Sequence, residues 1–463
     1  MTTSPDIVWV TLDSVRADHT SMGEYERDTT PNLQRIADSS GGQYFSNCFA
    51  SGNGTPISSA SILTGTQPSR HGIGGPNEVV PNQLPTVPQL LGEAGYRIAC
   101  LSRNSYVSSG TGLDRGFDRF KWISSSSFLQ EVPYKTIAKW ALNIRRHSAG
   151  FTTNTAKHAT PFLINDIAKD WLNEFDAQDK PFFCYLHYNE PHRPYYPPLP
   201  YLDEYTDDID MTTEEATDIA MHVHRNAVEI MANGCELGEK EIAALHAMYD
   251  AEIRYTDECV GRLYDHIQEL DREVVFVVTA DHGELFCEHG LLAHRLVVTD
   301  PVTHVPLVVD GLDGVAGAAD DIVQHLDIST TLVAQVGGKT RTMQGIDLRT
   351  ETRDGAISQR GPTEFDSYLN YNPSFDTSQF PSGWLTSYRT RDFRFEYSED
   401  HSALFKPPDE ETDVSGNYPD LVAEFEATVT DWLETEGQTV EGGEESNLTD
   451  EMRDQLRNLG YME

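Results

Sequence analysis

Positive charge is scarce in this chain. It has 9 Lys and 25 Arg against 74 Asp and Glu, which gives a formal net charge of −40. Broad binding to nucleic acid or to an anionic membrane requires a basic surface, so this composition argues against both partners. An acidic, lysine-poor surface repels itself, and dissolved salt screens that repulsion. The composition therefore predicts a protein of a halophilic cytosol.

Long apolar runs are also absent. The N-terminal run at residues 7–10 is too short for a signal or membrane segment. A membrane span needs about 20 apolar residues, and no such stretch occurs. The six Cys are scattered without a Cys-x-x-Cys pair, which favours reduced, mostly buried thiols over disulfides or a zinc knuckle. We therefore expect a soluble, cytoplasmic protein with no membrane span.

Apolar residues make up 38% of the chain and 45 aromatic residues are spread along it, so a folded protein is expected. Strand-like and helix-like segments alternate, which predicts an α/β fold with a mostly parallel central sheet flanked by helices. The expected strands are 6–12, 43–50, 97–101, 181–187, 273–279 and 305–309, and the expected helices include 57–63, 84–94, 162–175, 239–270 and 328–336.

After about residue 345 the amino-acid composition changes, and the sequence predicts strands rich in Arg, Ser and Tyr followed by an acidic helix. We therefore expect two units, residues 1–345 and a smaller C-terminal α+β subdomain at 346–463. The subdomain includes an acidic, flexible tail at 434–447.

Acidic and imidazole side chains follow three predicted strands. Asp13 ends the first strand, Asp281 and His282 follow the strand at 273–279, and His192 follows the strand at 181–187. Ligands of open α/β sheets bind at the carboxyl ends of strands, and carboxylates with imidazole suit one or two divalent metals. A single strand-end Asp can instead cap a turn, but several at separate strand ends favour a metal site.

A Gly-rich turn, Ser-Gly-Asn-Gly at 51–54, leads directly into a predicted helix at Thr55. Free N–H groups and the helix dipole favour an anion at such a point. A metal-bound Thr hydroxyl there could act as an alkoxide nucleophile. The other interpretation of Thr55 is a plain helix cap. Ser58 and Ser59 are alternative hydroxyls.

Several segments, in order over residues 6–310, resemble the sulfatase family of the alkaline phosphatase superfamily. They are TLDSVRADH, TTPNLQRIA, SILTGTQPSRHG, PFFCYLHYNEPHRPY, YDAEIRYTDECVGRL and TADHGELFCEHG, and the C-terminal LRNLGYME is also similar. The resemblance implies an alkaline-phosphatase-like fold with residues 1–345 as the catalytic domain. It implies a metal-dependent ester hydrolase, and the acidic composition points to a haloarchaeal source.

The resemblance also implies roles for individual residues. Asp13, Asp281 and His282 match metal ligands, His192 matches a residue that contacts the anionic oxygens of the substrate, and His294 falls near the leaving-group oxygen. His282 stands where calcium sulfatases carry Asn, and imidazole favours manganese or zinc over calcium, which remains possible. The implied substrate is a small anionic ester such as a sulfated or phosphorylated glycan.

The segment at the nucleophile departs from the family. Sulfatases carry Cys/Ser-x-Pro-x-Arg, whose first residue becomes formylglycine, whereas this chain has Thr55-Pro-Ile-Ser-Ser59. Thr cannot form that aldehyde, and phosphoryl-transferring relatives use Thr as a nucleophile. Leu12 replaces a second family acid, so one oxygen ligand is missing. We therefore expect a hydrolase of sulfate or phosphate esters in which Thr55 is both nucleophile and metal ligand. The alternatives are a phosphodiesterase, a phospho-head-group transferase acting on a glycan or lipid precursor, and a non-catalytic anion-binding relative.

Overall fold

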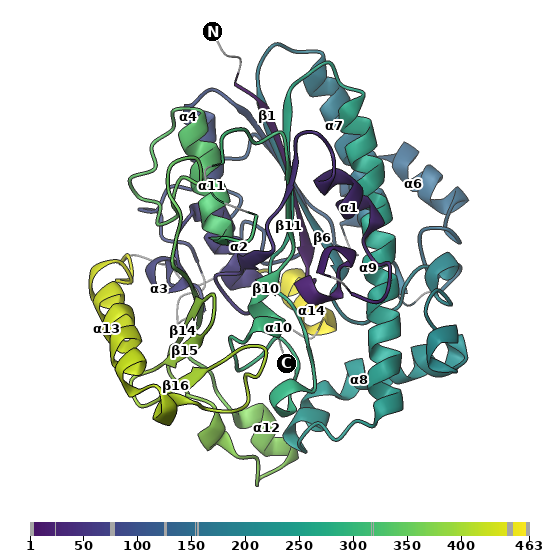
Figure 1. Cartoon of the computed structure of the whole chain (residues 1–463). Helices are drawn as coiled ribbons and strands as arrows, with labels where there is room; N and C mark the ends of the chain where they lie inside the picture. Colours follow the sequence, from purple (N-terminus) through teal and green to yellow (C-terminus); the bar gives the residue numbers. More distant parts are fainter. Residues whose placement is uncertain are drawn as a thin grey trace.

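The computed structural model describes residues 4–23, 25–74, 79–124, 127–152, 154, 157–315, 317, 319–441 and 448–459. A seven-stranded sheet with the order β2-β11-β7-β1-β6-β4-β5 runs through its centre (Figure 1). Its strands are β1 (Asp6–Asp13), β2 (Gly42–Tyr44), β4 (Arg97–Ser102), β5 (Arg119–Trp122), β6 (Phe182–Pro191), β7 (Val274–Ala280) and β11 (Leu307–Asp310). β11 is antiparallel to its two neighbours, and the other pairings are parallel. The predicted mostly parallel sheet is confirmed.

Two groups of helices cover the two faces of the sheet, as Figure 1 shows. One group is α1 (Pro31–Ala37), α7 (Pro161–Asp176) and α9 (Glu239–Gln268), and the other is α2 (Thr55–Thr64), α4 (Val87–Glu93) and α11 (His325–Gln335). The apolar stripe of α9 is buried, including Ile253, Val260 and Leu263. Among the described helices, none has both the length and the apolar character that crossing a bilayer would need.

Residues beyond 345 build a separate antiparallel sheet. Its strands are β13 (Gly355–Arg360), β14 (Leu385–Thr390), β15 (Arg394–Tyr397) and β16 (Ser402–Phe405). The acidic helix α13 (Pro419–Thr435) packs Phe425 and Val429 against Phe395 and Leu404 of this sheet. The predicted tail is described only to residue 441, and residues 442–447 and 460–463 lie outside the described part.

Further helices and strands connect these layers. They are β3 (Asn47–Phe49), β8 (Leu285–Phe286), β9 (Leu292–Ala293), β10 (His304–Val305), β12 (Ile322–Gln324), α3 (Pro68–His71), α5 (Phe128–Glu131), α6 (Tyr134–Leu142), α8 (Thr213–Ala232), α10 (Asp300–Thr303), α12 (Asp366–Tyr371) and α14 (Asp450–Leu459). The single strand predicted at 43–50 was wrong. The segment turns between β2 and β3, so that β2 extends the central sheet while β3 joins a small sheet with β10 and β12.

The prediction of reduced thiols was wrong for two of the six cysteines. Cys235 and Cys287 form a disulfide, although 52 residues separate them in sequence. The other four cysteines are free and buried, as expected. The sequence held no sign of this pair, because only the fold brings the loop after α8 against the turn after β8.

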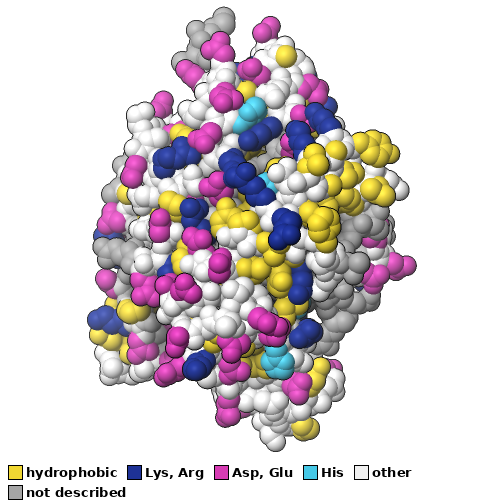
Figure 2. All heavy atoms as spheres, turned by 90° about the vertical axis from the view of Figure 1, so that its right-hand side faces the viewer, with side chains coloured by type: hydrophobic (Ala, Val, Ile, Leu, Met, Phe, Trp, Pro, Cys, Tyr) yellow, Lys and Arg dark blue, Asp and Glu magenta, His cyan; other side chains and the backbone are white. Residues whose placement is uncertain are grey.

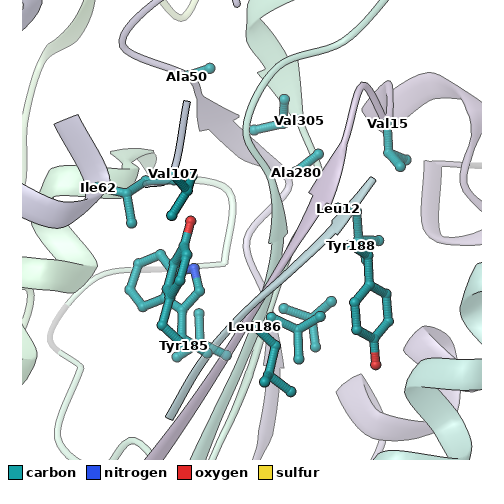
Figure 3. Close-up of a cluster of buried hydrophobic side chains, with 14 of the residues drawn as sticks. Leu12, Val15, Ala50, Ile62, Val107, Tyr185, Leu186, Tyr188, Ala280 and Val305 are labelled. Atoms are coloured by element: carbon teal, nitrogen blue, oxygen red, sulfur yellow. The ribbon is translucent and has the colours of Figure 1, made fainter. Parts of the chain in front are cut away.

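The core extends to the edge of the sheet at which the polar strand ends gather. Figure 3 shows Leu12 among buried apolar side chains that include Val15, Tyr188 and Ala280. Leu12 is therefore a core residue, and Asp13 is the first polar side chain at this end of β1.

Candidate active site

The site lies where the carboxyl ends of β1 and β7 meet the N-terminus of α2. β1 and β7 are paired as far as Leu12 and Ala280, so Asp13 and Asp281 leave adjacent strands at the same level. Thr55 is the first residue of α2 and follows the N-cap Gly54. A Cβ at Gly54 would lie 3.4 Å from the ring of His294, so glycine lets the turn approach that imidazole closely.

Asp13, Asp281 and His282 form a buried cluster of three groups that could hold a metal ion. One ligand atom of each residue lies within 4.8 Å of the others. His282 Nε2 lies 3.5 Å from Asp13 Oδ1 and 3.7 Å from Asp281 Oδ1. The structure thus brings together three of the four residues predicted as metal ligands.

The hydrogen bonds around this cluster leave one nitrogen of His282 and one oxygen of Asp281 available to a cation. His282 Nδ1 lies 2.8 Å from the carbonyl oxygen of Gly283 and so carries the proton that this bond requires. Nε2 therefore presents its lone pair to the two carboxylates. Asp281 Oδ2 is buried and has no hydrogen-bond partner among the described residues. A buried lone pair and an unsatisfied carboxylate oxygen fit a cation between them.

The Thr55 hydroxyl joins this cluster. Thr55 Oγ1 lies 3.4 Å from Asp13 Oδ1 and 3.3 Å from His282 Nε2. By contrast, Ser58 Oγ donates to the carbonyl of Gly52 at 3.0 Å, and Ser59 is fully buried in α2. Within the described residues, Thr55 is thus the hydroxyl of this helix turn that contacts the cluster.

Three residues that the sequence did not single out as ligands also reach Asp13. Asn104, just beyond β4, donates from Nδ2 to Asp13 Oδ2 at 3.1 Å, and His187 Nε2 of β6 lies 3.7 Å from the same oxygen. Ser14 Oγ donates to Asp13 Oδ1 at 3.2 Å. The position of Asn104 three residues after the strand predicted at 97–101 was the available signal for it.

The two carboxyl groups of the cluster titrate in opposite directions. Burial opposes ionisation of Asp13, but the imidazoles of His192 and His187 outweigh it and hold the pKa of Asp13 well below its usual range. Burial and then the charge of Asp13 raise the pKa of Asp281 to about 8. Two acids this close share a proton unless a cation replaces it.

His192 and His294 lie beside the cluster, as predicted. The ring of His294 lies 4.2 Å from that of His282 and 5.4 Å from that of His192, measured between centroids. Burial lowers the pKa of His192 to about 4 and, with the neighbouring His282, lowers the pKa of His294 well below its usual range. Both rings are therefore neutral at pH 7. His192 Nδ1 lies 2.9 Å from the carbonyl oxygen of Arg193 and carries the ring proton, which leaves Nε2 as a lone pair.

A cavity of about 330 Å³ opens beside Thr55 and His294. It is lined by residues of the Gly-rich turn and by residues beyond 345, among them Arg360, Glu364 and Tyr368. Arg295 also lines it. The arginines give this mouth positive charge in a molecule that otherwise carries a large excess of acid.

Comparison with known sequences and structures gives consistent matches. The family model described as Sulfatase matches residues 5–338. The chain is 26% identical over 284 residues to the uncharacterized sulfatase YidJ of Escherichia coli, a match that covers 59% of this chain and 56% of that relative. It is 24% identical over 370 residues to an arylsulfatase of Clostridium perfringens, covering 71% of this chain and 74% of the relative.

Among solved structures, the phosphonate monoester hydrolase of Agrobacterium radiobacter superposes with a TM-score of 0.71. The superposition covers 93% of this chain and 96% of that one at 17% sequence identity, so it concerns the fold. The aligned part spans only about half of the Escherichia coli relative.

Proposed function

Because the chain belongs to the sulfatase family, as the match over residues 5–338 establishes, we propose that it hydrolyses a sulfate or phosphate ester with the Thr55 hydroxyl as nucleophile. The observation that carries this proposal is the contact of Thr55 Oγ1 with both Asp13 and His282, at 3.4 and 3.3 Å. A hydroxyl at the N-terminus of a buried helix, within reach of a ligand cluster, is placed for attack on an anionic ester.

In this proposal Asp13, Asp281, His282 and the Thr55 oxygen hold a divalent metal ion. One imidazole with oxygen ligands suits manganese or zinc better than calcium. A bound divalent ion would polarise the ester and lower the pKa of a coordinated hydroxyl. Asn104 fixes one oxygen of Asp13, so that the other is directed at Thr55 and His282.

The remaining residues act on the substrate. The first-turn N–H groups of α2 donate hydrogen bonds to the anionic oxygens. His192 Nδ1 already donates to the carbonyl of Arg193, so Nε2 would donate to the substrate once the charge of the bound anion raises the pKa of His192 and the ring takes up a proton. His294 lies within 3.9 Å of Glu284 and faces the cavity, where it would stand by the leaving-group oxygen. In this proposal residues 1–345 supply the chemistry, while residues 346–463 line one side of the cavity.

The departure from the sulfatase pattern bears on the choice of ester. Ser59 replaces the family Arg, and Thr55 cannot become formylglycine. These two residues favour a phosphate mono- or diester, whereas membership of the family favours a sulfate ester. A small sulfated or phosphorylated glycan fits either reaction.

The test measures hydrolysis of aryl sulfate, aryl phosphate and aryl phosphodiester substrates by the purified protein in high salt, with and without Mn²⁺. We expect metal-dependent turnover of at least one ester and loss of several orders of magnitude in kcat for Thr55→Ala. Ser58→Ala is the matched control and should retain activity. Full activity of Thr55→Ala would refute the nucleophile assignment. No turnover, with no metal detected by elemental analysis, would favour a non-catalytic anion-binding protein.

A further inference from the structure

The segment from residue 132 to residue 165 differs from the rest of this acidic chain. It contains no Asp or Glu and five basic residues, Lys135, Lys139, Arg145, Arg146 and Lys157. It includes α6, which lies at the margin of the molecule in Figure 1. We refer to residues 132–165 as the cationic segment.

Large apolar side chains are exposed on and beside this segment. The exposed fractions are 68% for Leu129, 82% for Tyr134, 87% for Leu142 and 87% for Phe151. Elsewhere in the described residues, the other large apolar side chains that are exposed are Tyr371 at 56% and Tyr418 at 37%. Figure 2 shows hydrophobic side chains gathered beside Lys and Arg on the face that carries α6. Exposure of this kind in one place marks an interaction surface.

Part of the positive charge of the segment is already paired. Lys135 lies 2.6 Å from Asp170, and Lys139 lies 2.5 Å from Asp166 on the neighbouring helix α7. In contrast, Arg145 and Arg146 are exposed and form no ion pair with any described residue. Lys157 is half-buried over the ring of Tyr196, 4.1 Å from its centroid. The exposed charge without an ion pair therefore lies just after α6, between Leu142 and Phe151.

We propose that this face docks on the surface of an anionic lipid bilayer. Leu142 and Phe151 would enter the boundary between head groups and acyl chains, and Arg145 and Arg146 would pair with lipid phosphates. Exposed apolar side chains next to unpaired arginines are the pattern by which a protein binds a membrane surface without crossing it. The net charge of −40 does not prevent this, since repulsion from distant acids is screened beyond about 10 Å at 0.1 M salt.

The shape of the face favours a bilayer over a second copy of the chain. Tyr134, Leu142 and Phe151 are each more than four-fifths exposed, so the rest of the chain covers little of their surface. Protein interfaces bury such side chains in complementary pockets. A fluid head-group layer instead admits exposed side chains without a complementary pocket.

The experiment is co-sedimentation of the full chain with phosphatidylcholine vesicles and with vesicles that contain phosphatidylglycerol. It is run at the lowest NaCl concentration that leaves the near-UV circular dichroism unchanged. Two variants test the face, Leu142→Ser/Phe151→Ser and Arg145→Gln/Arg146→Gln. Their matched controls are Tyr371→Ser/Tyr418→Ser and Lys339→Gln/Arg341→Gln, which change exposed residues elsewhere.

We expect roughly tenfold or stronger partitioning of the wild type onto the anionic vesicles, falling as salt rises. Both test variants should lose most of this binding, while both controls keep it and all variants keep esterase activity. Absence of binding by the folded wild type, or equal binding by the test variants, would overturn the proposal. A concentration-dependent dimer that the test variants dissociate, without vesicle binding, would assign the face to a second copy.

Discussion

At the residue scale, the orientation of Asp13 depends on a neighbour outside the ligand cluster. Asn104 Nδ2 donates to Asp13 Oδ2, and Asn104 Oδ1 in turn accepts the N–H of Tyr106 at 3.0 Å, which fixes the amide orientation. We expect Asn104→Ala to weaken Mn²⁺ binding roughly 10–100-fold, because partners of metal ligands contribute about this much. Calorimetric titration with Mn²⁺ measures this effect without an assay of turnover.

Asn233→Ala is the matched control, since Asn233 is exposed at the end of α8 and bonds only the carbonyl of Glu229 among its described contacts. It should bind Mn²⁺ as the wild type does. An Asn104→Ala protein with unchanged Mn²⁺ affinity would show that Asp13 needs no positioning by this amide.

Most of the site could be predicted from residue type and position along the chain. The side chains that the structure brings together as expected are those of Asp13, Thr55, Asp281, His282, His192 and His294. Their roles in catalysis remain predictions. Asn104 was missed because an amide after a strand is common in turns, and only the parallel pairing of β4 beside β6 brings it to Asp13.

At the element scale, the joint between α2 and α3 depends on a neutral histidine. His71 Nδ1 accepts the N–H of Ile73 at 3.1 Å, and its Nε2 contacts Ser61 Oγ of α2 at 3.1 Å. Burial lowers the pKa of His71 from 6.5 to about 3. Below pH 6.5 the unfolded chain therefore binds a proton that the folded chain excludes.

Because the pKa of His71 is lower in the folded chain than in the unfolded chain, acid destabilises the fold. His71 leaves the free energy of unfolding unchanged above pH 6.5, and lowers it by about 1.4 kcal/mol per pH unit as the pH falls toward the folded pKa. We expect His71→Gln to reduce the slope of unfolding free energy against pH, between about pH 6 and pH 4, by the amount that corresponds to about one bound proton. Urea denaturation at a series of pH values measures the slope.

His222→Gln, which changes an exposed histidine of α8, should leave that slope as it is in the wild type. If His71→Gln also left it unchanged, the α2–α3 joint would have to tolerate a protonated ring.

Long elements with a clear period were predictable, and short ones were not. The helix expected at 239–270 is α9, and the strand expected at 273–279 is β7, because burial imposes an unambiguous pattern on both. The sequence of residues 103–160 has no clear period, and the strands and helices among its described residues are the short elements β5, α5 and α6. α6 lies largely on the surface, so burial imposes little hydrophobic pattern on its sequence.

At the scale of the whole molecule, the excess of acid lies on exposed surfaces away from the site. Helix α13 is an example, since all its acids are exposed and it carries no base. They are Asp420, Glu424, Glu426, Asp431 and Glu434. The net charge indicated acidic surface of this kind but gave no sign of the cationic segment, because a sum over the chain says nothing about local charge.

Mutual repulsion of these acids should make stability depend on salt. We expect the Tm of the wild type to rise as NaCl is increased from about 0.1 M to about 2 M, since the Debye length shrinks below the spacing of surface charges. Glu424→Gln/Glu426→Gln/Asp431→Asn should raise Tm at low salt and reduce its dependence on salt. Differential scanning calorimetry over the salt series measures both.

The charge-preserving variant Glu424→Asp/Glu426→Asp/Asp431→Glu separates charge from helix propensity, because it alters the same three positions and keeps their charge. It should follow the salt dependence of the wild type. A wild-type Tm that stays constant or falls over this range would mean that ion pairs and hydration of the acids already offset their repulsion. The composition would then no longer support the prediction of a halophilic protein.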